Sequence, residues 1–197
     1  PSTVFSENWS GMQGGWTGDI GNANSKWRFG TNSTPTANTG PNDSHNGPLF
    51  LYFDADNTGI TSSGTLISPE INLALANNQA ILSFWLHAYG DDIPGSKLTI
   101  SAGTNPVGPF KEVYSRTFNK ELQNDYNDPY VQEFADLSNY VGENIYLEFK
   151  FENPNSGNKS DIAIDLIEVE ACNNPVLPQD AGIVDIPKPE YFNLNVN

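Results

Sequence analysis

Residues 144–152 alternate strictly between apolar and polar side chains, and this alternation is the feature that most restricts the fold. The apolar positions are Ile145, Leu147, Phe149 and Phe151. A period of two predicts a β-strand with one face buried and the other in water. Helical periodicity is nearly absent, and its one short candidate, residues 73–79, is interpreted as a turn. Segments of this kind bury their apolar faces by packing one sheet against another.

Nine further segments rich in β-branched and aromatic residues also predict strands. They span residues 3–9, 27–30, 49–54, 64–68, 81–89, 97–102, 111–117, 130–136 and 161–170. Clusters of Gly, Pro, Asn, Asp and Ser separate them, for example at residues 31–47 and 153–160. Many strands, long polar loops and hardly any helix predict an all-β fold, a two-sheet antiparallel β-sandwich or jelly roll.

The charge of the chain argues against two classes of partner. Its 197 residues carry 24 acids against 9 bases, a formal net charge of -15. A nucleic-acid-binding protein needs a basic face, and an anionic membrane surface would repel this chain. No apolar run reaches the roughly 20 residues that a membrane-spanning helix needs. The acidic surplus suits divalent cations, or simply keeps the surface solvated.

The strand pattern ends near Cys172, so we expect one domain over residues 1–172. Residues 173–197 contain four prolines and are interpreted as a linker, or as the truncated start of a following Ig-like module with a first strand at 180–186. The chain opens without a signal peptide, which favours a mature form or a fragment of a longer precursor. A single cysteine cannot form an intramolecular disulfide. A cysteine-poor chain is compatible with the cytosol and with a secreted bacterial protein stabilised by metal, and the Asn-, Gly-, Thr- and Ser-rich composition favours the second.

Several short motifs occur in a fixed order along the chain. They include Phe5-Ser-Glu-Asn-Trp9, Trp27-Arg-Phe-Gly30, Gly40-Pro-Asn-Asp-Ser-His-Asn-Gly47, Leu66-Ile-Ser-Pro69, Leu82-Ser-Phe-Trp-Leu-His-Ala-Tyr-Gly90 and Ser160-Asp-Ile-Ala-Ile-Asp-Leu-Ile167. Over residues 3–171 this series resembles the MAM domain (meprin, A5, receptor phosphatase mu) and its bacterial relatives, the cleaved-adhesin domains. The resemblance implies a jelly roll. The chain lacks the disulfide cysteines of animal members, and Leu166 stands where the family often has a second Asp.

The resemblance also implies a structural calcium ion near the first and last strands. The matching acids are Glu7, Asp43 and Asp165, with Asp161 as a fourth ligand or an outer-shell group and His45 beside the ion. Calcium binds six to eight oxygen ligands, and it would neutralise carboxylates that are costly to bury next to a core. The alternative is that Asp165 accepts backbone hydrogen bonds and Glu7 faces water.

Catalysis finds little support in the sequence. The chain contains no metalloprotease, serine-hydrolase or Cys/His motif, and His87 is interpreted as a packed strand residue. Asp165, Glu168 and Glu170 are spaced like paired glycosidase carboxylates, but the alternation breaks at Leu166 and they need not share a face. We therefore expect no catalytic residues and no cofactor other than calcium.

By resemblance the chain is expected to be an adhesion or protein-interaction module of a larger secreted or cell-surface protein, which could accompany a secreted peptidase. The first alternative is a carbohydrate-binding module of a polysaccharide-degrading enzyme, in which exposed aromatic rings stack on sugars. The second alternative is a purely structural spacer. The candidate rings for such stacking are Trp9, Trp16, Tyr52, Tyr126 and Tyr130. Against the first alternative, the resemblance places Trp16, Trp27 and Trp85 in the core.

Overall fold

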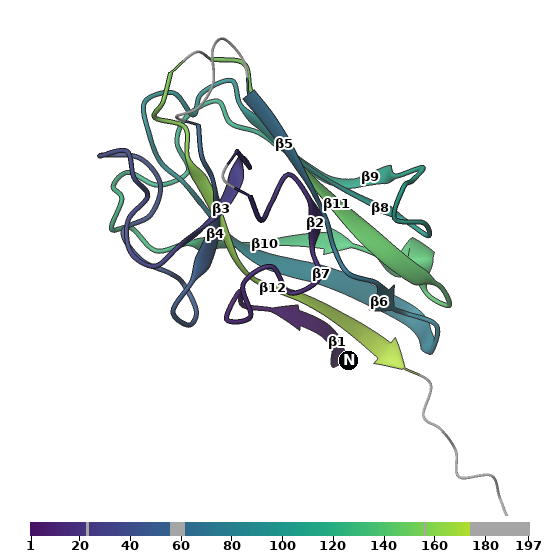
Figure 1. The fold of residues 1–197 in the computed structure, drawn as a ribbon. Coiled ribbons are helices and arrows are strands. Elements are labelled where there is room, and N and C mark those ends of the chain that lie inside the picture. The colour runs from purple at the N-terminus through teal and green to yellow at the C-terminus, as the bar shows by residue number, and fades with distance from the viewer. Residues whose placement is uncertain (23, 56–61, 156, 174–197) are drawn as a thin grey trace, which may run out of the picture.

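The computed structural model describes residues 1–22, 24–55, 62–155 and 157–173 (Figure 1). These residues form two packed antiparallel sheets, so the predicted all-β sandwich is confirmed. The proposed linker or Ig-like start at 174–197 lies outside the described residues.

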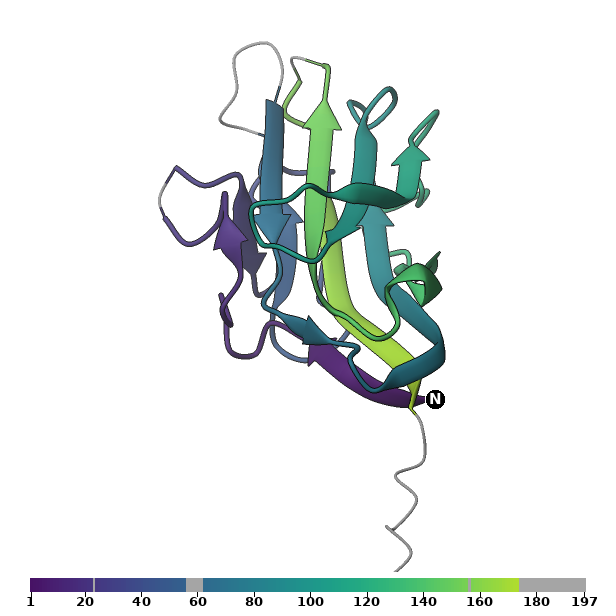
Figure 2. The same cartoon turned by 90° about the vertical axis from the view of Figure 1, so that its right-hand side faces the viewer.

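One sheet, here the β12 sheet, has the order β10 (Val131–Asp136), β7 (Ala76–Ala88), β12 (Ile162–Asn173), β4 (Phe50–Phe53) and β3 (Trp27–Gly30), with β1 (Ser2–Glu7) also beside β12. The other, the β11 sheet, has the order β2 (Thr17–Gly18), β5 (Ser62–Ile67), β11 (Asn144–Asn153), β8 (Lys97–Gly103) and β9 (Lys111–Thr117), with β6 (Ile71–Asn72) also beside β11. Strands of the β11 sheet face the viewer in Figure 2. A single 3-10 turn, η1, spans Ser138–Tyr140 among the described residues.

The ten strands predicted from alternation and composition all occur, and β3 and β9 have the predicted bounds. The helical candidate at 73–79 is a turn followed by the first residues of β7, which begins at Ala76. The two strands that were not predicted, β2 and β6, have two residues each. Two residues are too few to show a period in the sequence. Only pairing with a neighbouring strand defines them: β2 pairs with β5, and β6 pairs with β11.

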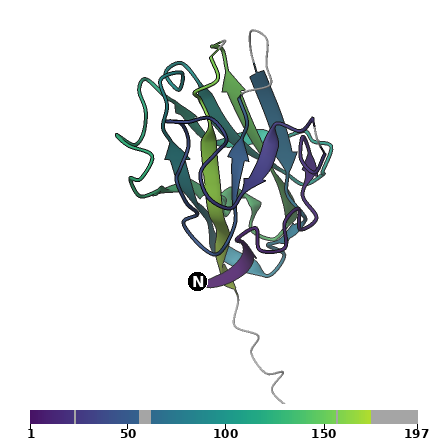
Figure 3. The same ribbon diagram turned by 60° about the vertical axis from the view of Figure 1, so that its left-hand side comes forward.

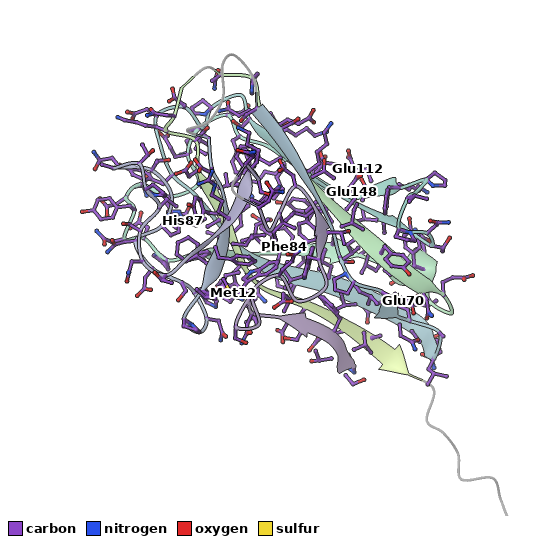
Figure 4. All side chains as sticks on the ribbon, in the orientation of Figure 1. Met12, Glu70, Phe84, His87, Glu112 and Glu148 are labelled. Carbon is purple, nitrogen blue, oxygen red and sulfur yellow. The ribbon has the colours of Figure 1, made fainter. Side chains whose placement is uncertain are left out.

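Aromatic side chains fill the space between the sheets. Phe84 of β7 lies between the two layers in Figure 4 and meets Phe149 of β11 edge-on, with ring centroids 6.1 Å apart. Trp16 packs against Phe149 at 5.6 Å and against Trp9 at 5.1 Å. All four of these side chains are fully buried, and truncating such a side chain in a close-packed core costs about 3–5 kcal/mol.

A β-bulge interrupts β12 where the alternation was expected to break. The pairing with β7 shifts between Asp165 and Glu168, and Leu166 has a φ of 41° in the left-handed region. Before the bulge β12 pairs with β4, and after it with β1, which lies beside β12 in Figure 1. The extra residue keeps Asp165, Glu168 and Glu170 on one face, whereas the sequence left this open.

Candidate functional site

The outer face of the β12 sheet gathers most of the residues that the sequence singled out. Directly paired residues of antiparallel strands point to the same face, so the register gives rows across β1, β12, β7 and β10. The first row is Thr3, Glu170, Ile81 and Asp136; the second is Ser6, Glu168, Ser83 and Phe134. We call these two rows the open half. The third row, Asp165, Trp85 and Gln132, leads into the covered half, formed with Phe50, Tyr52, His87, Tyr130 and Ala163.

Asp165 fixes a loop over the covered half. Its side chain is fully buried, and its Oδ2 atom accepts hydrogen bonds of 2.8 Å from the backbone N–H groups of His45 and Asn46. The Oδ1 atom accepts a third, from the Leu166 N–H in the bulge. Burial raises the pKa of Asp165 to about 6, while the three amide donors act in the opposite direction. The carboxylate thus joins the 31–49 loop to the last strand.

Asp161 contacts the middle of the same loop, at Thr39. Its Oδ1 atom accepts a hydrogen bond from the Ala55 N–H at 3.0 Å, and its own N–H donates to the Thr39 hydroxyl. The Thr39 hydroxyl and the Gly40 N–H both donate to the Tyr89 carbonyl. Two buried acids, one just before β12 and one within it, therefore contact the loop at Thr39 and at His45 and Asn46.

His45 lies on Trp85. The two rings are stacked, with centroids 3.7 Å apart and an angle of 17° between their planes. Burial lowers the pKa of His45. The expectation that Trp85 is a core residue is wrong, because it has the outward parity of β7 and is only half-buried, under the loop.

His87 and Tyr130 form the inner part of the covered half, where the 31–49 and 119–130 loops approach each other (Figures 1 and 3). The Tyr130 hydroxyl donates to the Asp43 carbonyl at 3.2 Å. His87 is fully buried, as expected of a packed strand residue, and it is labelled in Figure 4. Burial lowers its pKa to about 4, against the opposing effect of Asp128 and Asp125. The imidazole is therefore neutral at pH 7.

A hollow of about 260 Å³ lies between residues 41–45 and 126–130. Tyr126 lines it and is half-buried, together with the polar side chains of Asn42, Asp43 and Asn127. The other four rings proposed to stack on sugars, Trp9, Trp16, Tyr52 and Tyr130, are buried, so those four candidates are wrong.

The three predicted metal ligands have separate partners. Both Glu7 carboxylate oxygens accept hydrogen bonds, one from the Trp9 N–H at 2.7 Å and the other from the Trp16 indole at 3.2 Å. Asp43 is exposed and accepts from the Ser44 N–H. Asp165 reaches the loop that carries Asp43. Within the described parts of the chain, no three His, Cys, Asp or Glu side chains are grouped to hold a metal ion. The donors present thus do not form one calcium cage as they stand, and calcium binding stays a prediction.

The open half is the part that sequence reasoning missed. Phe134 of β10 is 57% exposed, although phenylalanine is usually buried. A signal was present, since Phe134 has the same parity as Gln132 and Asp136, the polar side of its strand. Ile81 and Trp85, both half-buried, share its face.

In the described chain no helix is long and apolar enough to span a membrane.

Known proteins provide an independent comparison. The family model described as "MAM domain, meprin/A5/mu" matches residues 5–173. Neuropilin-1a of Danio rerio is 31% identical over 101 residues, which are 47% of this chain and 11% of the neuropilin, so the match spans about a tenth of that relative.

Two solved structures have a similar fold. The K1 cleaved adhesin domain of Lys-gingipain from Porphyromonas gingivalis W83 has a TM-score of 0.59 and 19% identity, covering 88% of this chain and 100% of that one. CBM27-1 of Caldicellulosiruptor saccharolyticus, solved in complex with mannohexaose, has a TM-score of 0.51 and 13% identity, covering 87% and 97%. At these identities the likeness concerns the β-sandwich fold alone.

Proposed function

Because the chain belongs to the MAM domain family, we propose that it is a non-catalytic module that binds another protein, within a larger secreted or cell-surface protein. MAM and adhesin domains are extracellular, and this supports the proposed location. A bacterial parent in which the module accompanies a secreted peptidase is part of the same proposal. A fold by itself does not specify function, so the proposal also needs a surface.

The open half of the outer face is the observation that carries the proposal. Phe134 is exposed on β10, the edge strand of the sheet, and half-buried Ile81 lies on the same face of the neighbouring strand β7, so association would remove this apolar surface from water. Aromatic side chains are enriched at the centres of protein interfaces. We therefore assign the contact with a partner to Phe134 and its neighbours.

Selection of peptides tests this assignment. A phage library of random 12-residue peptides would be selected on the immobilised domain and on its Phe134→Ser variant. Val107, which is 88% exposed in the connection between β8 and β9 on the other sheet, provides the matched control Val107→Ser. We expect peptides that bind the native domain and the control but not Phe134→Ser. Peptides retained equally by both variants, or no selected peptides, would contradict the assignment.

Glycan binding in the hollow is the second candidate. Half-buried Tyr126 offers a ring for stacking, and the neighbouring carboxylate and carboxamide groups suit sugar hydroxyls. The sandwich also resembles a module that was solved with mannohexaose. A glycan array that includes mannohexaose separates the two functions: binding that is lost in Tyr126→Ala and kept in Phe134→Ser would favour the hollow, whereas a blank array would exclude it.

A structural calcium ion remains part of the proposal, with Glu7, Asp43 and Asp165 as its candidate ligands. The net charge of -15 and the family resemblance support it. The hydrogen bonds of Glu7 and Asp165 argue against it, since a bound ion would compete with protein N–H groups for the same oxygens.

A further inference from the structure

Charge is divided unequally between the two sheets. The strands β1, β7, β10 and β12 contain six acids and no Lys or Arg, as their sequences show. In the other sheet, β8, β9 and β11 carry four bases: Lys97, Lys111, Arg116 and Lys150. Acids are interspersed with them, among them Glu112 and Glu148, both labelled on the outer side of the β11 sheet in Figure 4. The strands β1, β7, β10 and β12 are therefore acidic, although β3 of the same sheet carries Arg28, and the strands of the other sheet are close to balanced.

Three of the six acids on the acidic strands lie outside the two rows of the open half. Glu7 is bonded to two tryptophans, Asp165 to three amides, and Glu133 forms an ion pair with Arg116 of β9. The other three, Asp136, Glu168 and Glu170, lie in the two rows of the open half. These rows place Ser83 between Phe134 and Glu168, and Ile81 between Asp136 and Glu170.

From this arrangement we infer that the open half binds a basic protein segment, in which Lys or Arg side chains flank an apolar or aromatic one. The inference rests on the proposed function and specifies its partner. The apolar residue of the partner covers Phe134 and Ile81, while its cations meet Glu168, Glu170 and Asp136. Complementary charge of this kind steers encounter and selects partners. A second copy of the chain does not fit, because two such faces would bring like charges together.

Charge reversal on the two faces tests the inference. The variant Glu168→Lys/Glu170→Lys changes the open half. Its control, Glu143→Lys/Glu148→Lys, makes the same change in net charge next to and on β11. Peptides selected on the native domain should be enriched in Lys and Arg. Their affinity should fall about tenfold or more in the first variant and change little in the control. Raising NaCl from 50 to 300 mM should also weaken their binding, because salt screens exposed charges.

Each other outcome overturns the inference in a recognisable way. Selected peptides that depend on Phe134 but lack basic residues would leave the proposed function standing and remove the basic partner. Equal losses in the two double variants would show that net charge alone, and not this face, attracts the peptides. Sedimentation that shows a dimer abolished by Phe134→Ser would make the occupant a second copy. If no peptide is selected at all, the result contradicts the proposed function, and the inference that rests on it is overturned as well.

Discussion

At the scale of single residues, Asp165 shows how a carboxylate can be kept in a strand next to the core. A buried charge is costly unless it is paired or hydrogen-bonded. Here the compensation comes from three backbone N–H groups, two of them at the turn of the 31–49 loop. The same contacts hold His45 over Trp85, so one side chain organises the covered half of the outer face.

Replacing Asp165 with Asn should destabilise the fold by about 1–3 kcal/mol, because the amide group presents a donor to an N–H that needs an acceptor. The native pKa of about 6 lies above the ordinary value of 3.8, so the folded state binds a proton more tightly than the unfolded state. The contribution of Asp165 to stability is therefore full below pH 3.8 and is lost as pH rises through 6.

Urea unfolding of both proteins at pH 5 and pH 7.5 measures this effect. The native protein should exceed Asp165→Asn by more at pH 5 than at pH 7.5. Burial also lowers the pKa of His87 to about 4, so the contribution of His87 to the stability of the fold decreases as pH falls over the same range. This effect is the same in both proteins, and comparing them removes it. A difference that instead grows with pH would mean that the amide hydrogen bonds outweigh burial.

At the scale of elements, β12 is the strand on which the sheet depends. It pairs with β7 along its length, with β4 before the bulge and with β1 after it. Leu166 supplies the extra residue, in a backbone conformation that glycine adopts without cost and leucine does not. The bulge therefore redirects the strand while Asp165 stays on the same face as Glu168.

Leu166→Gly should change the free energy of unfolding by less than about 1 kcal/mol, because relief of the left-handed conformation offsets the packing lost by a half-buried leucine. The control is Ile164→Gly in the same strand, at a fully buried position. It should cost more than about 3 kcal/mol. Equal losses in urea unfolding would show that Leu166 does not adopt the left-handed conformation in solution.

At the scale of the whole molecule, β1, β7, β10 and β12 carry acids without bases, whereas β8, β9 and β11 carry both, so part of the net charge of -15 is concentrated on one sheet. The excess of acid also destabilises the compact state through repulsion between like charges. Any cation should relieve that repulsion, so a specific calcium effect has to be distinguished from screening.

Calcium at a hundred times its dissociation constant should stabilise the protein by about 2.7 kcal/mol, which corresponds to a rise in Tm of about 5–10 °C over the EDTA-treated protein. The comparison is made against NaCl of equal ionic strength. The rise should disappear in Asp43→Ala, whose side chain is exposed, and persist in the control Glu143→Ala. An equal rise in Tm with NaCl would show that calcium acts only by screening charge. Glu7, Asp43 and Asp165 would then be held by hydrogen bonds alone.

The sequence by itself determined the strands and the class of fold, because alternation in 144–152 and its counterparts is a local property of the chain. It also located Asp161 and Asp165 as residues that need partners, and the break at Leu166. Only the tertiary structure decided what those partners are, because the amides of residues 45 and 46, which bind Asp165, are 119–120 positions away from it in the sequence. It also placed Trp85 outside the core and left Phe134 exposed among acids, since the face that a strand buries depends on which strands and loops cover it.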